Sequence, residues 1–308
     1  MNQGVFGFPA ALGGSVLSTK EIDASGTYLI APGTKRLVIF AVGAGGGGGA
    51  GGKRASGTAQ SGGSGASGGA QVYQDFNVED LGGVNTTLSI VIGAGGLAGA
   101  TAGDTAAGGA GGTGGTTTIT PTGKPGFLIS CLGGVAGAGG TNTITTGGAA
   151  RTGFSYGATL THIGGTGCNG TTGVPNDLSI LSTNSHGGVA GAGLAATPVA
   201  IGGGQCFFSA ITATSYNCSI DNSRAAGIIG NLQGTSTVTT VNPNIHIMGK
   251  MSPGIGGNGG GSGTTGATKG GNGYRGSGGG GGGSTLNTFT AGTGGTGGNG
   301  YVCITAIG

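Results

Sequence analysis

The sequence predicts an all-β fold built with polyglycine II, in which β-hairpins and short strands frame a bundle of polyglycine-II helices, with essentially no α-helix. Glycine accounts for 85 of the 308 residues, about 28% against a usual share of roughly 7%. Many of these glycines recur at every third position, and segments rich in Val, Ile, Thr and aromatic residues bracket the runs. No segment carries a helical apolar period over three turns.

The apolar segments are the expected strands. Pro32-Gly33 supplies a turn between the first two of them, as in a hairpin. The strands are expected at residues 27–31, 36–42, 88–92, 116–120, 127–132 and 301–307.

The glycine runs predict the second element. One run has glycine at every third position from Gly254 to Gly266, and another runs from Gly270 to Gly282 after a slip of one residue around Lys269. A three-residue period matches the polyproline-II type of helix, which has no internal hydrogen bonds. Its N–H and C=O groups must pair with neighbouring segments, which come close enough only where a Cβ is missing. The alternative, a flexible Gly/Ser linker, is disfavoured by the bracketing strands.

The composition excludes several classes of protein. Charged residues make up 6% of the chain, there are 8 Pro, and the net charge is +3. Collagen needs abundant proline, and disordered tails combine low hydrophobicity with high net charge. The closest approach to a basic cluster is Lys53-Arg54, which we interpret as a solvated loop pair. We therefore expect no nucleic-acid partner.

Catalytic and cofactor motifs are not convincing. VIFAVGAGGGG from Val38 and VIGAGG from Val91 imitate a dinucleotide-binding turn, but no amphipathic helical pattern follows either. Glu79 and Asp80 are adjacent and would face opposite sides of a strand, unlike a glycosidase pair. We expect no enzymatic activity, no cofactor and no metal. A capsule-degrading enzyme is disfavoured by the scarcity of carboxylates.

The five cysteines follow no metal-binding spacing. Cys206 and Cys218 either pair in an oxidising setting or stay free, partly buried thiols. The start of the chain lacks the pattern of a signal peptide, and no stretch approaches the roughly 18 apolar residues of a membrane span. We expect synthesis in a cytoplasm.

Side-chain diversity is concentrated between the glycine runs, at residues 141–163, 174–185, 205–233 and 237–251. Loops on a rigid frame commonly carry function, and aromatic side chains are common anchors at interfaces. The alternative is that the aromatic residues at 207, 208 and 216 form a small core that pins the loops. The candidate contact residues are Phe154, Tyr156, Phe207, Phe208 and Tyr216.

The combination GTYLIAPGTKRLVIFAVGAGGGGG, LSIVIGAGG, GGAGGTGGTTTIT and GGTGGNGYVCIT resembles the glycine-rich domain of tailed-bacteriophage tail-fibre and receptor-binding proteins. The opening GVFGFPAALGGS is similar to the start of distal adhesins on T-even-like long tail fibres. The resemblance implies a docking segment at residues 1–24, with Phe6, Phe8 and Pro9 in contact with the fibre. It implies a glycine-rich receptor-binding domain at residues 25–308. The segment before the first hairpin is short and has no Trp, so both a monomeric cap and a homotrimer stay open.

The sequence therefore favours a non-enzymatic virion protein, the adhesin at the tip of a tail fibre. Its expected partners are other tail-fibre proteins and a host outer-membrane protein or surface polysaccharide. The alternative is a purely architectural glycine-rich protein of a virion or cell surface that binds no receptor.

Overall fold

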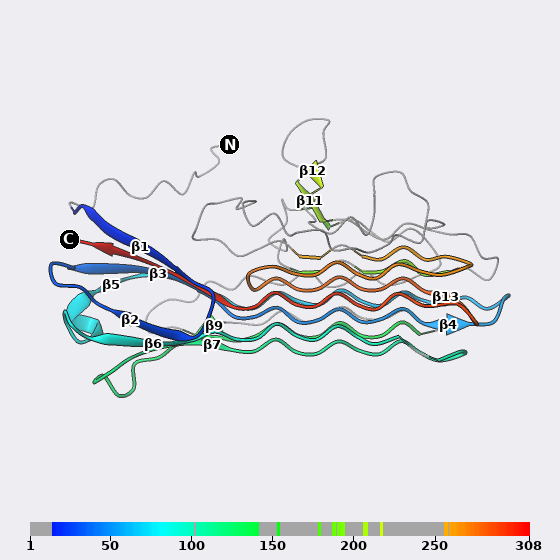
Figure 1. Ribbon diagram of the computed structural model, residues 1–308, viewed down its shortest axis with the longest axis horizontal. Coiled ribbons are helices and arrows are strands. Elements are labelled where there is room, and N and C mark those ends of the chain that lie inside the picture. The colour runs from blue at the N-terminus through cyan, green and yellow to red at the C-terminus, as the bar shows by residue number, and fades with distance from the viewer. Residues whose placement is uncertain are drawn as a thin grey trace.

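The computed structural model describes residues 14–101, 103–141, 187–188, 190–194, 256–257 and 259–308, and the backbone of four short strands between residues 153 and 217. The described chain forms a β-sandwich at one end, from which a long bundle of extended segments continues (Figure 1). Helical structure in these residues is confined to a short 3-10 helix, η1 (Val78–Leu81). The predicted fold class, all-β with essentially no α-helix, is confirmed for this part of the chain.

The first sheet has four antiparallel strands in the order β1-β14-β3-β5. The central strand β3 is buried on both faces, which explains why its sequence RLVIFAV is a continuous apolar run rather than an alternating one. The strands are β1 (Val16–Ile22), β14 (Tyr301–Ile307), β3 (Arg36–Val42) and β5 (Gln71–Asn77).

The second sheet has five antiparallel strands in the order β2-β6-β7-β8-β9. It packs on the first sheet through one apolar core to which both sheets contribute, including Ile39 and Val302 from one and Leu88 and Ile129 from the other. The strands are β2 (Gly26–Leu29), β6 (Thr87–Val91), β7 (Thr117–Pro121), β8 (Ile129–Cys131) and β9 (Gly153–Phe154).

The predicted hairpin around Pro32-Gly33 is wrong, although the turn itself is present. Thr34 N–H donates to Ala31 O across it, and Gly33 has a φ of 85°, a conformation that favours glycine. The turn carries the chain from β2 in one sheet to β3 in the other, so the two strands do not pair. A turn sequence specifies the local bend, whereas strand pairing depends on which apolar faces meet in the core.

The predicted boundary after residue 24 does not separate an independent segment from the domain. Strand β1, inside that segment, pairs with β14 along its length, with Lys20 opposite Ile304. Gly308 N–H donates to Ser15 O, so the start of β1 and the end of the chain lie side by side. Strands β1 and β5 contain no apolar run that would predict them, because both are mainly polar, and β1 is exposed at six of its seven positions.

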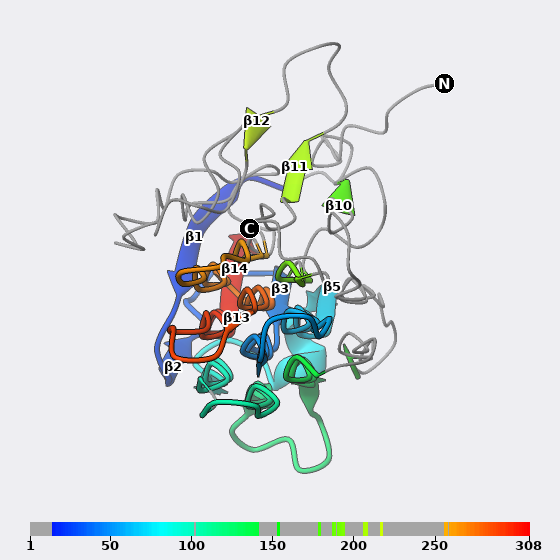
Figure 2. The same ribbon diagram turned by 90° about the vertical axis from the view of Figure 1, so that its right-hand side faces the viewer.

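The bundle is held together by main-chain hydrogen bonds. Along a segment, consecutive N–H groups donate to three different neighbouring segments, and this order repeats every three residues. In residues 44–52, successive N–H groups donate in turn to residues 292–298, 61–67 and 109–115. Gly45, Gly48 and Gly51 all donate to the first of these neighbours, at 2.8–2.9 Å. Seen end-on, the segments are compact triangular spirals packed side by side (Figure 2). The period is the one that the glycine runs predict.

The separation between segments leaves no room for side chains at the contact positions. A Cβ placed on Gly47 would lie 1.9 Å from Leu97 O, and one on Gly48 would lie 2.0 Å from Gly280 O. The two long glycine runs each include a turn. Residues 264–265 form a bend close to the slip at Lys269, and Gly276, with a φ of 79°, lies in a second turn.

Short strands complete the described structure. At the far end of the bundle, β4 (Lys53–Arg54) pairs in parallel with β13 (Thr285–Leu286). A separate small sheet has the order β10-β11-β12, with β10 (Leu178–Ser179), β11 (Cys206–Phe208) and β12 (Tyr216–Asn217).

Candidate functional site

The structure brings some of the sequence-predicted contact residues together. Phe208 lies opposite Tyr216 on β11 and β12, and Phe207 lies opposite Asn217. Phe154 is in a different sheet, on β9, opposite Ser130. The described residues do not include Tyr156 or the predicted docking residues Phe6, Phe8 and Pro9. Most of the four predicted loops also lies outside them.

Both long segments that contain those loops leave the described bundle at the end opposite the sandwich and rejoin it nearer the sandwich, where Gly188 N–H donates to Ala66 O and Gly257 N–H donates to Gly278 O. Gln60 and Leu194 exchange two main-chain hydrogen bonds of 2.9 Å, just before residue 195. Beside them, the Ser61 hydroxyl donates to Thr141 O and accepts from Thr141 N–H, both at 2.8 Å. The adjacent pair of residues 60 and 61 therefore anchors both exits.

The same end of the bundle carries a group of side chains that we call the distal tip. It comprises β4, β13 and the turns that follow or face them. It lies at the opposite end of the molecule from β1 and the C-terminus (Figure 1). Its members are Lys53, Arg54, Asp104, Thr105, Asn287, Thr288 and Phe289.

Two turns of the distal tip, 183 residues apart in sequence, hold each other by a reciprocal pair of hydrogen bonds. Asp104 Oδ1 accepts from Thr288 N–H at 2.9 Å, and Asn287 Oδ1 accepts from Thr105 N–H at 2.8 Å. Both threonines have positive φ, 59° and 70°, which is strained for a β-branched residue. Such strain persists only where surrounding contacts hold it, and here each turn supplies the contact for the other.

The basic pair at residues 53 and 54 is better ordered than the predicted solvated loop pair. Lys53 Nζ lies 3.6 Å from Asp104 Oδ1. Arg54 Nη1 donates to Thr105 O and makes a longer contact of 3.5 Å with Lys53 O. Both residues are half-buried on β4. Both side chains therefore contact the turn at residues 104–105, and the Arg54 carbonyl accepts from Asn287 N–H, at the other turn, at 2.8 Å.

A second polar cluster lies where the bundle meets the sandwich. Arg275 Nη2 donates to Glu21 Oε2 at 2.8 Å, and the Tyr301 hydroxyl donates to the same oxygen at 2.9 Å. The Arg275 guanidinium carbon lies 4.0 Å from the centre of the Tyr301 ring. Burial, the nearby Cys303 and the hydrogen bond to Glu21 raise the pKa of Tyr301 above its usual range, against the opposing effect of Arg275. These contacts attach the turn at Arg275 to the sheet.

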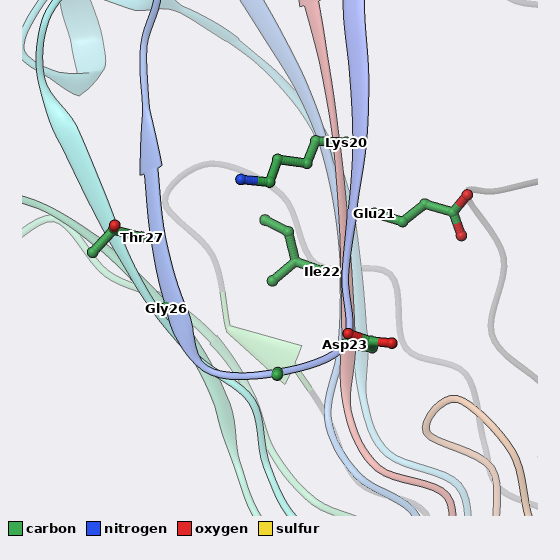
Figure 3. A pocket seen from close by; sticks show the side chains of 7 residues that line it. Lys20, Glu21, Ile22, Asp23, Gly26 and Thr27 are labelled. Carbon is green, nitrogen blue, oxygen red and sulfur yellow. The ribbon is translucent and has the colours of Figure 1, made fainter.

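A shallow hollow of about 230 Å³ opens between β1 and β2 (Figure 3). The Lys20 and Ile22 side chains point into it, whereas Glu21 points to the other face of the sheet. Lys20 Nζ lies 6.0 Å from the centre of the Tyr28 ring, so the lysine lies across the open edge of the sandwich. Its lining comes entirely from the end of β1, the connection to β2 and the start of β2.

The described cysteines are buried thiols inside the sandwich. Cys131 and Cys303 form no disulfide. Burial raises the pKa of Cys131 to about 12, against a smaller opposing effect of a hydrogen bond with Val72. A thiol is nucleophilic as its thiolate, so Cys131 is unreactive near neutral pH. Cys218 lies outside the described residues, and of Cys206 the structure describes the backbone alone, on β11.

Sequence reasoning missed the acidic and amide members of the distal tip. Asp104 and Asn287 each precede a threonine in a short interruption of the glycine pattern, and Asx residues in such places are typical of turns. That signal predicts two turns but not that they meet.

Within the described residues, no group of three His, Cys, Asp or Glu side chains is arranged to hold a metal ion. No described helix has the length and apolar character needed to cross a bilayer. Comparison with known proteins gives no matching protein-family model and no significant match among curated sequences.

Proposed function

We propose that the chain is a non-enzymatic structural protein of a bacteriophage virion, the adhesin at the tip of a tail fibre that recognises a receptor on the host cell surface. The observation that carries the proposal is the polarity of the architecture. The C-terminus and β1 lie at the sandwich end, while the distal tip, with its charged and polar side chains, lies at the other. This arrangement suits a protein held at one end that makes contact with the other.

We interpret the bundle as polyglycine-II helices, because hydrogen bonds that rotate by three residues support that assignment. Residues 44–52 alone then extend roughly 28 Å at about 3.1 Å per residue. Each segment is tied to its neighbours along its length, so the bundle is a stiff spacer between the two ends. A stiff spacer keeps the contact residues in register, which reduces the entropy lost on binding.

The receptor contact of this proposal includes the aromatic residues Phe154, Tyr156, Phe207, Phe208 and Tyr216. It is supported by the pairing of β11 with β12, which places Phe207, Phe208 and Tyr216 in one small sheet. Residues before β1, with Phe6, Phe8 and Pro9, would dock the protein to the fibre. The partners are other virion proteins on one side and an outer-membrane protein or surface polysaccharide on the other.

The test is binding of the purified full chain to a panel of intact bacteria, to their isolated outer-membrane proteins and to their surface polysaccharide. A variant with Phe207, Phe208 and Tyr216 changed to alanine is compared with the wild type. The matched control changes three exposed apolar residues of the sandwich to alanine, namely Leu29, Tyr73 and Val91.

We expect the wild type and the sandwich control to bind a subset of hosts, and the loop variant to lose that binding. Equal binding by all three proteins would overturn the assignment of the contact residues. No binding to any host would favour the architectural alternative. Release of reducing sugar from the polysaccharide would overturn the non-enzymatic part of the proposal.

A further inference from the structure

We propose that the distal tip binds an anionic group, a phosphate or a carboxylate, carried by a glycan of the host surface, with Arg54 as its anchor. This inference rests on the proposed function, because it specifies the chemistry of a receptor contacted at this end. It is independent of the aromatic residues on the loop segments.

The first argument is the way in which Arg54 is held. Its Nη1 group is used internally, on Thr105 O and Lys53 O. Within the described part of the chain, its Nε and Nη2 groups have no acceptor, and no carboxylate forms an ion pair with it. The Nε–Nη2 edge of a guanidinium is a planar fork that matches the two oxygens of a carboxylate or phosphate. The internal contacts therefore orient the side chain and leave that fork available.

The second argument is the distribution of charge along the molecule. Asp104 is the one described carboxylate at the distal end, and Lys53 lies against it. Lys269 is also near this end, since the carbonyl of the preceding Thr268 accepts from Gly283, two residues before β13. The other five described carboxylates all belong to the sandwich: Glu21, Asp23, Asp75, Glu79 and Asp80. The described distal end thus has an excess of positive charge, which attracts anions to it.

The third argument is preorganisation. The Thr105 carbonyl that orients Arg54 belongs to a residue with a φ of 59°, in the turn that the side chain of Asn287 holds. Backbone strain of this kind collects at ligand clamps and binding sites. The guanidinium is therefore oriented by a turn whose conformation the Asn287 side chain stabilises. This preorganisation lowers the entropic cost of binding a ligand.

The character of the tip favours a glycan over a protein surface or a nucleic acid. Protein interfaces have an apolar centre with several aromatic anchors, whereas the tip offers Phe289, 37% exposed, among hydroxyl, amide and charged groups. Binding to nucleic acid needs many phosphate contacts, and three described cations do not supply them. One oriented arginine, neighbouring hydroxyls and a single aromatic face match a charged sugar.

The experiment measures binding of the full chain to three immobilised polysaccharides: neutral dextran, uronate-bearing polygalacturonate and phosphate-bearing phosphomannan. The variants are Arg54→Gln, Arg54→Lys, which keeps the charge but loses the fork, and Lys124→Gln, which removes one exposed positive charge from the sandwich end. Thermal unfolding of each variant establishes that it is folded. Whole-cell binding is measured in parallel.

We expect binding to one or both anionic polymers, competed by inorganic phosphate, and none to dextran. Arg54→Gln should weaken it at least about tenfold, as loss of a charge-assisted bidentate contact does. Arg54→Lys should also weaken it, and Lys124→Gln should leave it within about twofold. Equal losses for Arg54→Gln and Lys124→Gln, or equal binding to dextran, would overturn the proposal. Cell binding by the wild type without binding to either anionic polymer would overturn this inference and leave the proposed function standing. Absence of both would count against both.

Discussion

A single added methyl group inside the bundle should lower the stability of the fold by more than its small volume suggests. Gly48→Ala tests this most directly. The new Cβ would lie 2.0 Å from Gly280 O, about 1.5 Å short of the roughly 3.5 Å of an unstrained contact. Moving residue 48 away from Gly280 strains its two main-chain hydrogen bonds, from Gly48 N–H to Gly295 O and from Gly99 N–H to Gly48 O, which are 2.9 and 2.8 Å long.

The expected loss follows from these contacts. Overpacking typically costs about 1–3 kcal/mol, and each weakened main-chain hydrogen bond adds up to about 1 kcal/mol. We therefore expect Gly48→Ala to lower the free energy of unfolding by about 3 kcal/mol. For a chain of 308 residues that corresponds to a fall in Tm of roughly 5 °C, measured by circular dichroism during heating and by urea titration.

The matched control is Gly26→Ala in strand β2. A Cβ at Gly26 would meet no atom within 4 Å, and the change should leave stability unchanged or raise it by about 0.5 kcal/mol through the unfolded state. If Gly48→Ala unfolded at the wild-type midpoint, the close approach of residues 48 and 280 would not exist in the native protein. The argument for glycine at the contact positions would then fail.

Two further predictions concern the sandwich and its junction with the bundle. The Cys131 thiol has a pKa raised from about 9 to about 12 in the folded protein, so its contribution to stability is complete below pH 9 and is lost as the pH rises toward 12. Urea midpoints measured from pH 8 to 11 should fall less steeply in Cys131→Ala than in the wild type, and parallel slopes would contradict this assignment. At the junction, Arg275→Ala removes a hydrogen bond to Glu21 and the stacking on Tyr301, and should lower stability by about 1–2 kcal/mol. An unchanged Tm would show that this contact does not stabilise the fold.

Much of the fold could be predicted because its signals are local. The predicted strands at residues 36–42 and 301–307 coincide with β3 and β14, and four others differ by one or two residues at each end. The continuous apolar runs of β3 and β14 predict burial on both faces, and the Val, Ile and Thr content of β6 and β7, which alternate between more and less buried positions, predicts strands; neither signal depends on the pairing partner. The mainly polar strand β1 has no such signal, because its pairing with β14 alone makes it a strand.

The sequence by itself determined the fold class and the three-residue period of the bundle. Both follow from short-range sterics, since a segment without Cβ atoms can approach its neighbours and a segment of Val, Ile and Thr favours a sheet. The tertiary structure alone decided which segments are neighbours. It placed β2 and β3 in different sheets, and it joined Asp104 to Thr288 across 184 residues and Asn287 to Thr105 across 182. Such pairings depend on how the whole chain closes on itself, and no local pattern of residues carries that information.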